Sequence, residues 1–121
     1  MLEKAEMEEA LALLHILVSC DTVNPPGNEK DLALKLQTLL VNEGIECQVD
    51  EFAPNRANLI FRIKGEAAGN GLLVTGHLDT VPPGEIPWKH SPFSCAIEKG
   101  YVYGRGVADM KGSDAAMLYA L

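Results

Sequence analysis

The order of sequence patterns along the 121 residues predicts an α/β fold with a mixed sheet flanked by helices. Three observations lead to this prediction: two leading segments with helical periodicity, several short segments with strand patterns, and a last apolar segment typical of a helix. Hydrophobic residues make up 47% and charged residues 22%, as in an ordinary globular protein. A chain of this length can bury one core, so we expect one domain at most.

The first two elements are predicted to be helices. Residues 2–19 repeat apolar side chains at helical spacing behind an acidic first turn, which suits the helix dipole. Residues 28–43 carry a second apolar stripe, and Gly44 follows where a C-terminal cap is expected. The run Asn24-Pro25-Pro26-Gly27 separates the two helices, because a helix does not continue into proline.

Three strand patterns follow the helices. Residues 45–50 alternate between apolar and polar side chains, which predicts a half-buried strand, and residues 57–63 predict a second strand. Residues 64–70 are polar and glycine-containing, as in a turn. Residues 71–75 form a continuous apolar run, which is typical of a strand buried on both faces.

The last part of the sequence predicts a hairpin and a helix. Residues 94–98 and 101–103 flank Lys99-Gly100, which favours a tight turn between two short strands. Residues 110–121 resemble the start of an apolar helix, and the sequence stops inside it without a cap. We therefore expect this chain to be part of a longer protein.

Charge and cysteine content argue against several classes of protein. Seventeen acidic against ten basic residues give a net charge of −7 with no basic cluster, which disfavours nucleic-acid binding. Three separated cysteines support neither a disulfide framework nor a cysteine-type zinc site and fit a reducing compartment. The N-terminus is acidic, unlike a signal peptide, and no apolar stretch is long enough to cross a bilayer. We therefore expect a cytoplasmic protein without a membrane partner.

The strongest candidate site is Gly-His-Leu-Asp at residues 76–79, directly after the apolar run. Ligands of open α/β sheets bind at the carboxyl ends of strands. His77 and Asp79 are two residues apart, so in extended backbone their side chains point the same way. An imidazole beside a carboxylate suits a metal ligand whose ring the carboxylate orients. The alternative is a loop histidine and a turn-forming aspartate.

A glycine-rich turn at residues 104–113 is the second candidate. Its glycines could bring Asp109 to the wall of a site, where the carboxylate could bind a metal ion. The alternative is that Asp109 caps the following helix. The glycine spacing matches neither a dinucleotide fingerprint nor a phosphate-binding loop, which argues against nucleotide binding.

The other reactive side chains are expected to be structural. His15 lies on an apolar helix face and should pack in or beside the core. His90 belongs to a loop and is expected to have a structural role, with substrate contact as the alternative. Ser113 lacks the context of a catalytic nucleophile. The remaining candidates are expected to be small buried residues: Cys20, Cys47 and Cys95.

Two motifs together, GHLDTVPPGE at residues 76–85 and YGRGVADMKG at residues 103–112, resemble the acetylornithine deacetylase / succinyl-diaminopimelate desuccinylase family of zinc peptidases and aminoacylases. The pair in this order is much more specific than either motif alone. The resemblance implies a zinc-peptidase-like catalytic domain that hydrolyses amide bonds in small N-acyl amino acids or short peptides. It also implies two neighbouring divalent metal ions, zinc first, with cobalt or manganese as alternatives.

The resemblance assigns a role to each candidate residue. His77 matches a ligand of one metal ion, and Asp109 matches the aspartate that bridges both ions. Asp79 matches the catalytic-site carboxylate that orients the histidine. Two such ions would polarise the amide carbonyl and lower the pKa of a bound water.

Later motifs of the family do not occur in these 121 residues. They are a Glu-Glu pair with the general base, a further acidic ligand, a final histidine, and a separate dimerisation or lid domain. We therefore expect residues 1–121 to be a partial catalytic domain that binds metal weakly and is inactive alone. A homo-oligomer is expected, and an exposed sheet edge would favour self-association.

Two other classes of function stay open. One is a non-catalytic binding or regulatory module that retains part of the fold. It differs from the hydrolase in whether the gene continues into a Glu-Glu motif. The other is a nucleotide-binding domain, which predicts thermal stabilisation by nucleotide that metal does not reproduce.

Overall fold

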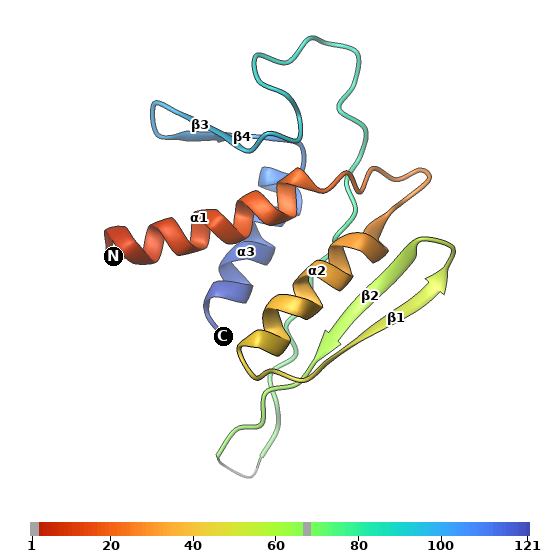
Figure 1. The fold of residues 1–121 in the computed structure, drawn as a ribbon, viewed down its shortest axis with the longest axis vertical. Coiled ribbons are helices and arrows are strands. Elements are labelled where there is room, and N and C mark those ends of the chain that lie inside the picture. The colour runs from red at the N-terminus through yellow and green to blue at the C-terminus, as the bar shows by residue number, and fades with distance from the viewer. Residues whose placement is uncertain (1–2, 67–68) are drawn as a thin grey trace.

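The computed structural model describes residues 3–66 and 69–121 as helices and two separate hairpins (Figure 1). The α/β class predicted from the sequence is confirmed. Of the predicted elements, residue 2 of the first helix and residues 67–68 of the turn lie outside the described residues. The helices are α1 (Lys4–Ser19), α2 (Glu29–Asn42) and α3 (Gly112–Tyr119), and α3 is preceded by a turn, η1 (Val107–Lys111), whose backbone is not helical at Asp109 and Met110. The strands are β1 (Cys47–Ala53), β2 (Arg56–Phe61), β3 (Ala96–Glu98) and β4 (Tyr101–Tyr103).

The predicted cap at Gly44 is confirmed. Gly44 has a φ of +79°, which a residue without a Cβ adopts at little cost. Its backbone N–H donates to Val41 O over 3.0 Å, and the N–H of Ile45 donates to Leu40 O over 2.8 Å. These two bonds satisfy the last carbonyls of α2 and turn the chain into β1.

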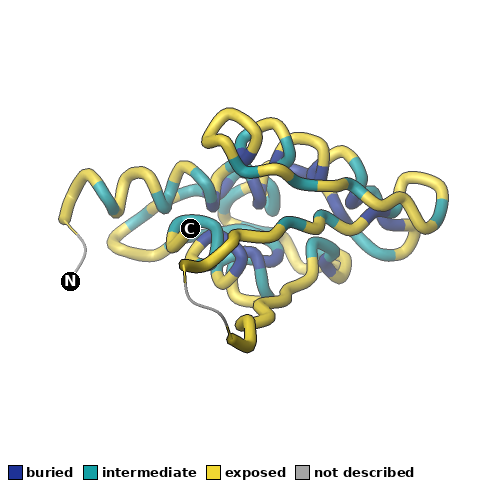
Figure 2. The backbone as a smooth tube through the Cα atoms, turned by 90° about the horizontal axis from the view of Figure 1, so that it is seen from below, coloured by how far each residue is buried: buried dark blue, intermediate teal, exposed yellow. Residues whose placement is uncertain are grey.

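One apolar core lies where the helices meet, and Figure 2 shows the buried backbone gathered in this middle region. Leu17 and Val18 of α1 and Leu32 of α2 are fully enclosed there. The N-terminal part of α1 extends beyond the core and is mostly exposed (Figure 2). His15 is exposed, so the expected core or boundary position is wrong, because His15 falls beyond the edge of the stripe formed by the buried Leu14, Leu17 and Val18.

The two hairpins lie at different ends of the molecule (Figure 1). The β1–β2 hairpin packs on α2, and its inner residues alternate with exposed ones as predicted. In the β3–β4 hairpin, Lys99 and Gly100 have φ values of +51° and +82°. Positive φ at both central residues is what a type I′ turn requires, so this predicted hairpin is confirmed.

The third predicted strand is absent from the structure. Residues 71–75 pair with no described strand, and Leu72 and Leu73 are 91% and 87% exposed instead of buried. A strand needs a neighbour to pair with, and among residues 3–66 and 69–121 no strand runs beside this segment. Both described sheets are antiparallel pairs, so the predicted mixed sheet is reduced to one isolated parallel bridge between Val23 and Thr80.

Within the described residues, no helix is both long enough and apolar enough to cross a membrane.

Candidate metal centre

The segment that follows His77 is held by the loop between α1 and α2. Thr80 N–H donates to Thr22 O over 3.0 Å, and Asn24 N–H donates to Thr80 O over 2.8 Å. The Thr22 hydroxyl donates to Leu78 O over 2.6 Å. Thr22 and Thr80 are both buried, so these bonds form away from water and fix the backbone beside His77.

The glycine-rich turn is anchored to the same loop by a buried lysine. Lys111 is completely buried, and its Nζ donates to Cys20 O over 2.9 Å at the end of α1. Gly106 has a φ of +86°, and a Cβ there would lie 2.6 Å from Thr80 Cγ2. Only glycine lets this turn approach Thr80 so closely, and the approach carries Asp109 to His77.

His77 and Asp79 lie on the same side, as the spacing of two residues predicts. His77 Nδ1 lies 3.0 Å from the backbone oxygen of Asp79 and 3.2 Å from its Oδ1. Both neighbours are acceptors, so Nδ1 carries the proton. This contact orients the imidazole ring and directs Nε2 to the opposite side.

His77 Nε2 and Asp109 Oδ1 lie 2.9 Å apart, although 32 residues separate them in the chain. With Nδ1–H donating to Asp79, a neutral ring would direct the lone pair of Nε2 towards a carboxylate oxygen of Asp109. Two such electron-rich atoms at this distance need a positive charge between them, either a proton on His77 or a metal ion. The helix-cap alternative for Asp109 is wrong, because α3 is preceded by Lys111 and the carboxylate of Asp109 contacts His77 instead.

Asp79 is held in turn by two residues that the sequence did not indicate as functional. Asn24 Nδ2 donates to Asp79 Oδ2 over 2.9 Å, and an Arg56 guanidinium nitrogen lies 3.9 Å from the same oxygen. Arg56 also pairs with the buried Glu29 at 2.8 Å. Asn24 belongs to the Asn-Pro-Pro-Gly run, which the sequence indicates only as a break between helices. Asn24 and Arg56 both lie far from Asp79 in the sequence, and no local pattern links them to it.

The site shifts the pKa of two titratable groups. Partial burial opposes protonation of His77, but the hydrogen bond to Asp109 and the Asp79 oxygens outweigh it and raise the pKa of the ring. Asp114 lies under Gly76, and burial raises its pKa to about 6, against the opposing charges of His77 and Lys111. Asp114 therefore gains its charge at a higher pH than an ordinary aspartate.

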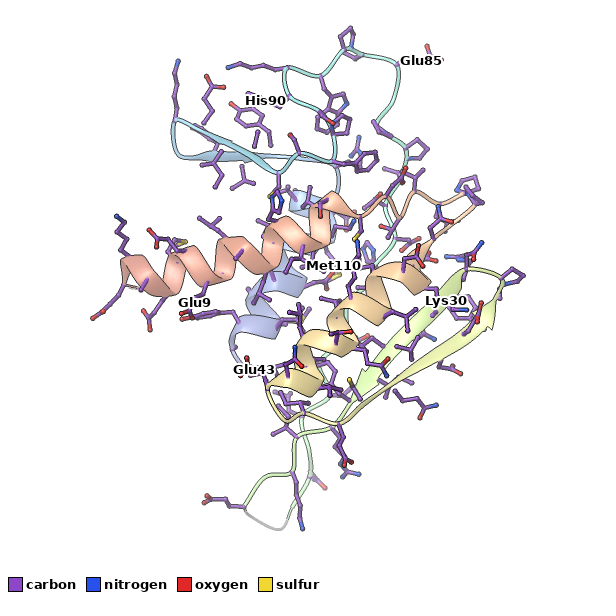
Figure 3. The ribbon with its side chains drawn as sticks, viewed as in Figure 1. Glu9, Lys30, Glu43, Glu85, His90 and Met110 are labelled. Carbon is purple, nitrogen blue, oxygen red and sulfur yellow. The ribbon has the colours of Figure 1, made fainter. Side chains whose placement is uncertain are left out.

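The remaining candidate residues lie away from this site. His90 is half-buried beside the β3–β4 hairpin, where Nε2 lies 2.9 Å from Glu98 Oε2. Figure 3 shows His90 near that hairpin and Met110, the neighbour of Asp109, in the middle of the molecule. Cys20 and Cys95 are buried as expected, whereas Cys47 is half-buried. Among the residues the structure describes, no group of three or more His, Cys, Asp or Glu side chains is arranged to hold a metal ion.

The donor set fits a divalent metal ion in part. Two ligands of one tetrahedral zinc ion lie about 3.3 Å apart when each is 2.0–2.1 Å from the metal. The 2.9 Å between His77 Nε2 and Asp109 Oδ1 is within a few tenths of an ångström of that separation. Imidazole nitrogen and carboxylate oxygen are both ligands that zinc accepts, and Asp79 supplies the carboxylate that orients such a histidine.

Comparison with known proteins links this chain to a family of hydrolases. Residues 73–121 match peptidase family M20/M25/M40. A succinyl-diaminopimelate desuccinylase of Methylorubrum populi is 42% identical over 119 residues, which are 93% of this chain and 30% of that protein. The enzyme of the same name from Alkalilimnicola ehrlichii is 38% identical over 118 residues, 95% of this chain and 30% of that protein.

A relative named for a different activity is also similar to this chain. An N-formyl-4-amino-5-aminomethyl-2-methylpyrimidine deformylase of Halalkalibacterium halodurans is 38% identical over 120 residues, 94% of this chain and 28% of that protein. The chain thus spans about 30% of the length of the relatives it matches. The names of these relatives share the removal of an acyl group, succinyl in one case and formyl in the other.

Proposed function

Because the chain belongs to peptidase family M20/M25/M40, we propose that it serves the metal-dependent hydrolysis of an amide bond in N-acyl amino acids or short peptides. The observation that carries this proposal is the convergence of His77 Nε2 and Asp109 Oδ1 at 2.9 Å. The desuccinylase and deformylase relatives support the same class of reaction.

In this proposal His77 would be a ligand of one divalent metal ion and Asp109 a ligand of both, with zinc preferred over cobalt or manganese. Bound ions of this kind supply a polarised amide carbonyl and a water of lowered pKa. Asp79 keeps the proton on His77 Nδ1, so that Nε2 stays available as a ligand. Asn24 and Arg56 hold Asp79 in that position from its second oxygen.

We further propose that residues 1–121 form a partial catalytic domain that binds metal weakly and is inactive alone. A zinc site normally has at least three protein ligands. The described residues bring two candidate ligands together, His77 and Asp109. A purified 121-residue chain that hydrolysed N-acetyl-ornithine at the rate of an ordinary enzyme would contradict this part of the proposal.

Metal binding can be tested with Co²⁺, followed by its visible absorption, and with Zn²⁺ as competitor. We expect weak binding that His77→Ala and Asp109→Asn abolish. His90→Ala is the matched control, because His90 Nε2 also lies 2.9 Å from a carboxylate, that of Glu98, outside the site. Equal loss of binding in His90→Ala, or retention in His77→Ala, would contradict the assignment.

To test the activity, the gene is sequenced past the codon for Leu121, and the protein encoded by the whole reading frame is assayed. A reading frame that continues into a Glu-Glu motif should yield a protein that hydrolyses N-succinyl or N-acetyl amino acids and loses this activity in Asp109→Asn. A stop codon directly after Leu121, together with no hydrolysis, would favour a non-catalytic binding module.

Two further proposals concern location and assembly. The free thiols of Cys20, Cys47 and Cys95 fit a cytoplasmic protein. The exposed side chains of Leu72 and Leu73 favour self-association into a homo-oligomer, because they leave apolar surface in water.

A further inference from the structure

Arg105 stands in the middle of the Gly-Arg-Gly turn and lines the same cavity as His77 and Asp109. Its backbone N–H donates to Pro92 O over 2.7 Å, which holds the residue at the base of the loop formed by residues 81–95. Its guanidinium carbon lies 5.3 Å from the centre of the Trp88 ring. Stacking on Trp88 limits where the guanidinium can go without using its N–H donors.

Those donors are poorly used within the protein. A terminal nitrogen of Arg105 donates to Pro83 O over a long 3.4 Å, and the buried Nε has no hydrogen-bond partner among the described residues. Leaving a buried N–H group without an acceptor is costly, so the Arg105 guanidinium would gain from an additional acceptor outside the described chain.

The contrast with Arg56 shows what is missing. Arg56 is also half-buried, and it is paired with Glu29 at 2.8 Å. No carboxylate in residues 3–66 or 69–121 lies within 4.0 Å of the Arg105 guanidinium. A guanidinium presents its donors in a planar fork that fits the two oxygens of a carboxylate.

The charges around the cavity restrict what can enter it. The cavity measures about 190 Å³, and Asp79 and Asp109 both line it. In the metal-free chain their negative charges would repel an anionic ligand, and Arg105 is the one permanently cationic residue among the described lining residues. A ligand with a carboxylate would therefore place that group at Arg105.

We propose that Arg105 is a specificity-determining residue that binds a carboxylate of the substrate while the amide bond lies at His77 and Asp109. This inference rests on the proposed function for the identity of the ligand. The substrate class it names is an N-acyl compound that carries a free carboxylate. That carboxylate comes either from a dicarboxylic acyl group or from the amino acid that bears the acyl group.

The test is an NMR titration of the ¹⁵N-labelled chain with three small amides, observed at the Arg105 Nε–Hε signal. N-methylsuccinamate carries the carboxylate on the acyl side, N-acetylglycine carries it on the amine side, and N-methylacetamide carries none. We expect saturable shifts with at least one of the two carboxylates and no shift with N-methylacetamide. The carboxylate that binds more tightly identifies which side of the amide faces Arg105.

Three variants complete the test. Arg105→Gln should weaken carboxylate binding roughly tenfold or more, the usual effect of losing a charge-assisted hydrogen bond. Arg105→Lys keeps the charge without the fork and should bind with intermediate affinity. Arg62→Gln is the matched control, because it removes the same charge from an exposed position outside the cavity and should leave binding unchanged.

The inference is overturned if the Nε–Hε signal of Arg105 responds to none of the carboxylates, or equally to N-methylacetamide. It is also overturned if Arg105→Gln binds as tightly as the unchanged chain. The titration on the unchanged chain needs no variant, so a folding defect in Arg105→Gln does not prevent a decision. Neither measurement depends on hydrolysis, so failure of the proposed activity and failure of this site are distinguishable.

Discussion

Residues 71–76 and residues 78–80 flank His77 on its two sides and are held very differently. On the C-terminal side, the Thr22 hydroxyl and two backbone bonds of Thr80 fix the segment to the loop between the first helices. On the N-terminal side, Leu72 and Leu73 are almost fully exposed and pair with no described strand. The comparison teaches that the candidate site is ordered by buried polar contacts from one side, although the strand-like sequence lies on the other.

The largest effect on stability is expected at Gly106, which packs tightly against Thr80 in the hydrogen-bonded segment 78–80. Gly106→Ala should lower the free energy of unfolding by about 3 kcal/mol, through positive φ and overpacking against Thr80. Gly100→Ala is the matched control, with φ of +82° and no atom within 4 Å of the added Cβ. It should cost only about 1 kcal/mol, the backbone part alone.

Urea unfolding measures both glycine variants. Equal losses in Gly106→Ala and Gly100→Ala would mean that the close approach to Thr80 does not hold the turn, and the comparison between the two sides would fail.

Removing the charge of Asp114, the buried carboxylate beside Gly76, should give the next largest effect on stability. The pKa of Asp114 is raised to about 6 by burial, so its ionised form is disfavoured in the folded chain. The stability from its protonated form is complete below the unfolded pKa near 3.8 and is lost as pH rises through about 6. Asp114→Asn should therefore stabilise the chain by on the order of 2 kcal/mol at pH 7.5.

The same variant should have almost no stability advantage at pH 3.5, because both forms are then neutral. Urea unfolding of Asp114→Asn and the unchanged chain across this pH range provides the measurement. A constant difference at all pH values would show that charge is not the cause.

Self-association is expected to depend on residues 71–76, which pair with no described strand. Leu73→Lys adds a charge to an exposed segment that makes no strand pair among the described residues. It should reduce the mass observed by light scattering at high concentration and change the unfolding free energy by less than about 0.5 kcal/mol. Ile97→Lys, on the exposed face of the paired strand β3, is the control and should leave the mass unchanged. A chain that is already monomeric at high concentration would contradict the proposed assembly.

The smallest effect concerns protonation of His77. Its pKa is raised because Asp109 and the Asp79 oxygens outweigh the opposing effect of partial burial. The stability gained from the charged ring is complete below the unfolded pKa and is lost as pH rises through the folded pKa. The His77–Asp109 pair is exposed, so solvent screening keeps this contribution small.

An NMR titration of His77 should give a midpoint above the ordinary value for histidine. Asp109→Asn should lower that midpoint, whereas Glu98→Gln, which removes the carboxylate beside His90, should leave it unchanged. An unchanged midpoint in Asp109→Asn would mean that the two side chains do not meet in solution.

The sequence by itself determined the local elements of this protein. The leucine periodicity and the Gly44 cap specify α2, and Lys99-Gly100 specifies a hairpin, because these signals depend on residues close together in the chain. The motif spacing also placed His77 beside Asp79, since alternation along extended backbone needs no partner.

Only the tertiary structure decided which distant residues meet. The family resemblance placed His77 and Asp109 in one site, but their contact joins segments far apart in the chain. The support of Asp79 by Asn24 and Arg56 and the bond from the buried Lys111 to Cys20 also join distant segments, and no pattern in the sequence indicated them. The same reason explains why the apolar run at residues 71–75 is exposed. Burial of a strand depends on neighbours that pair with it and cover its faces, and no pattern within the strand can supply them.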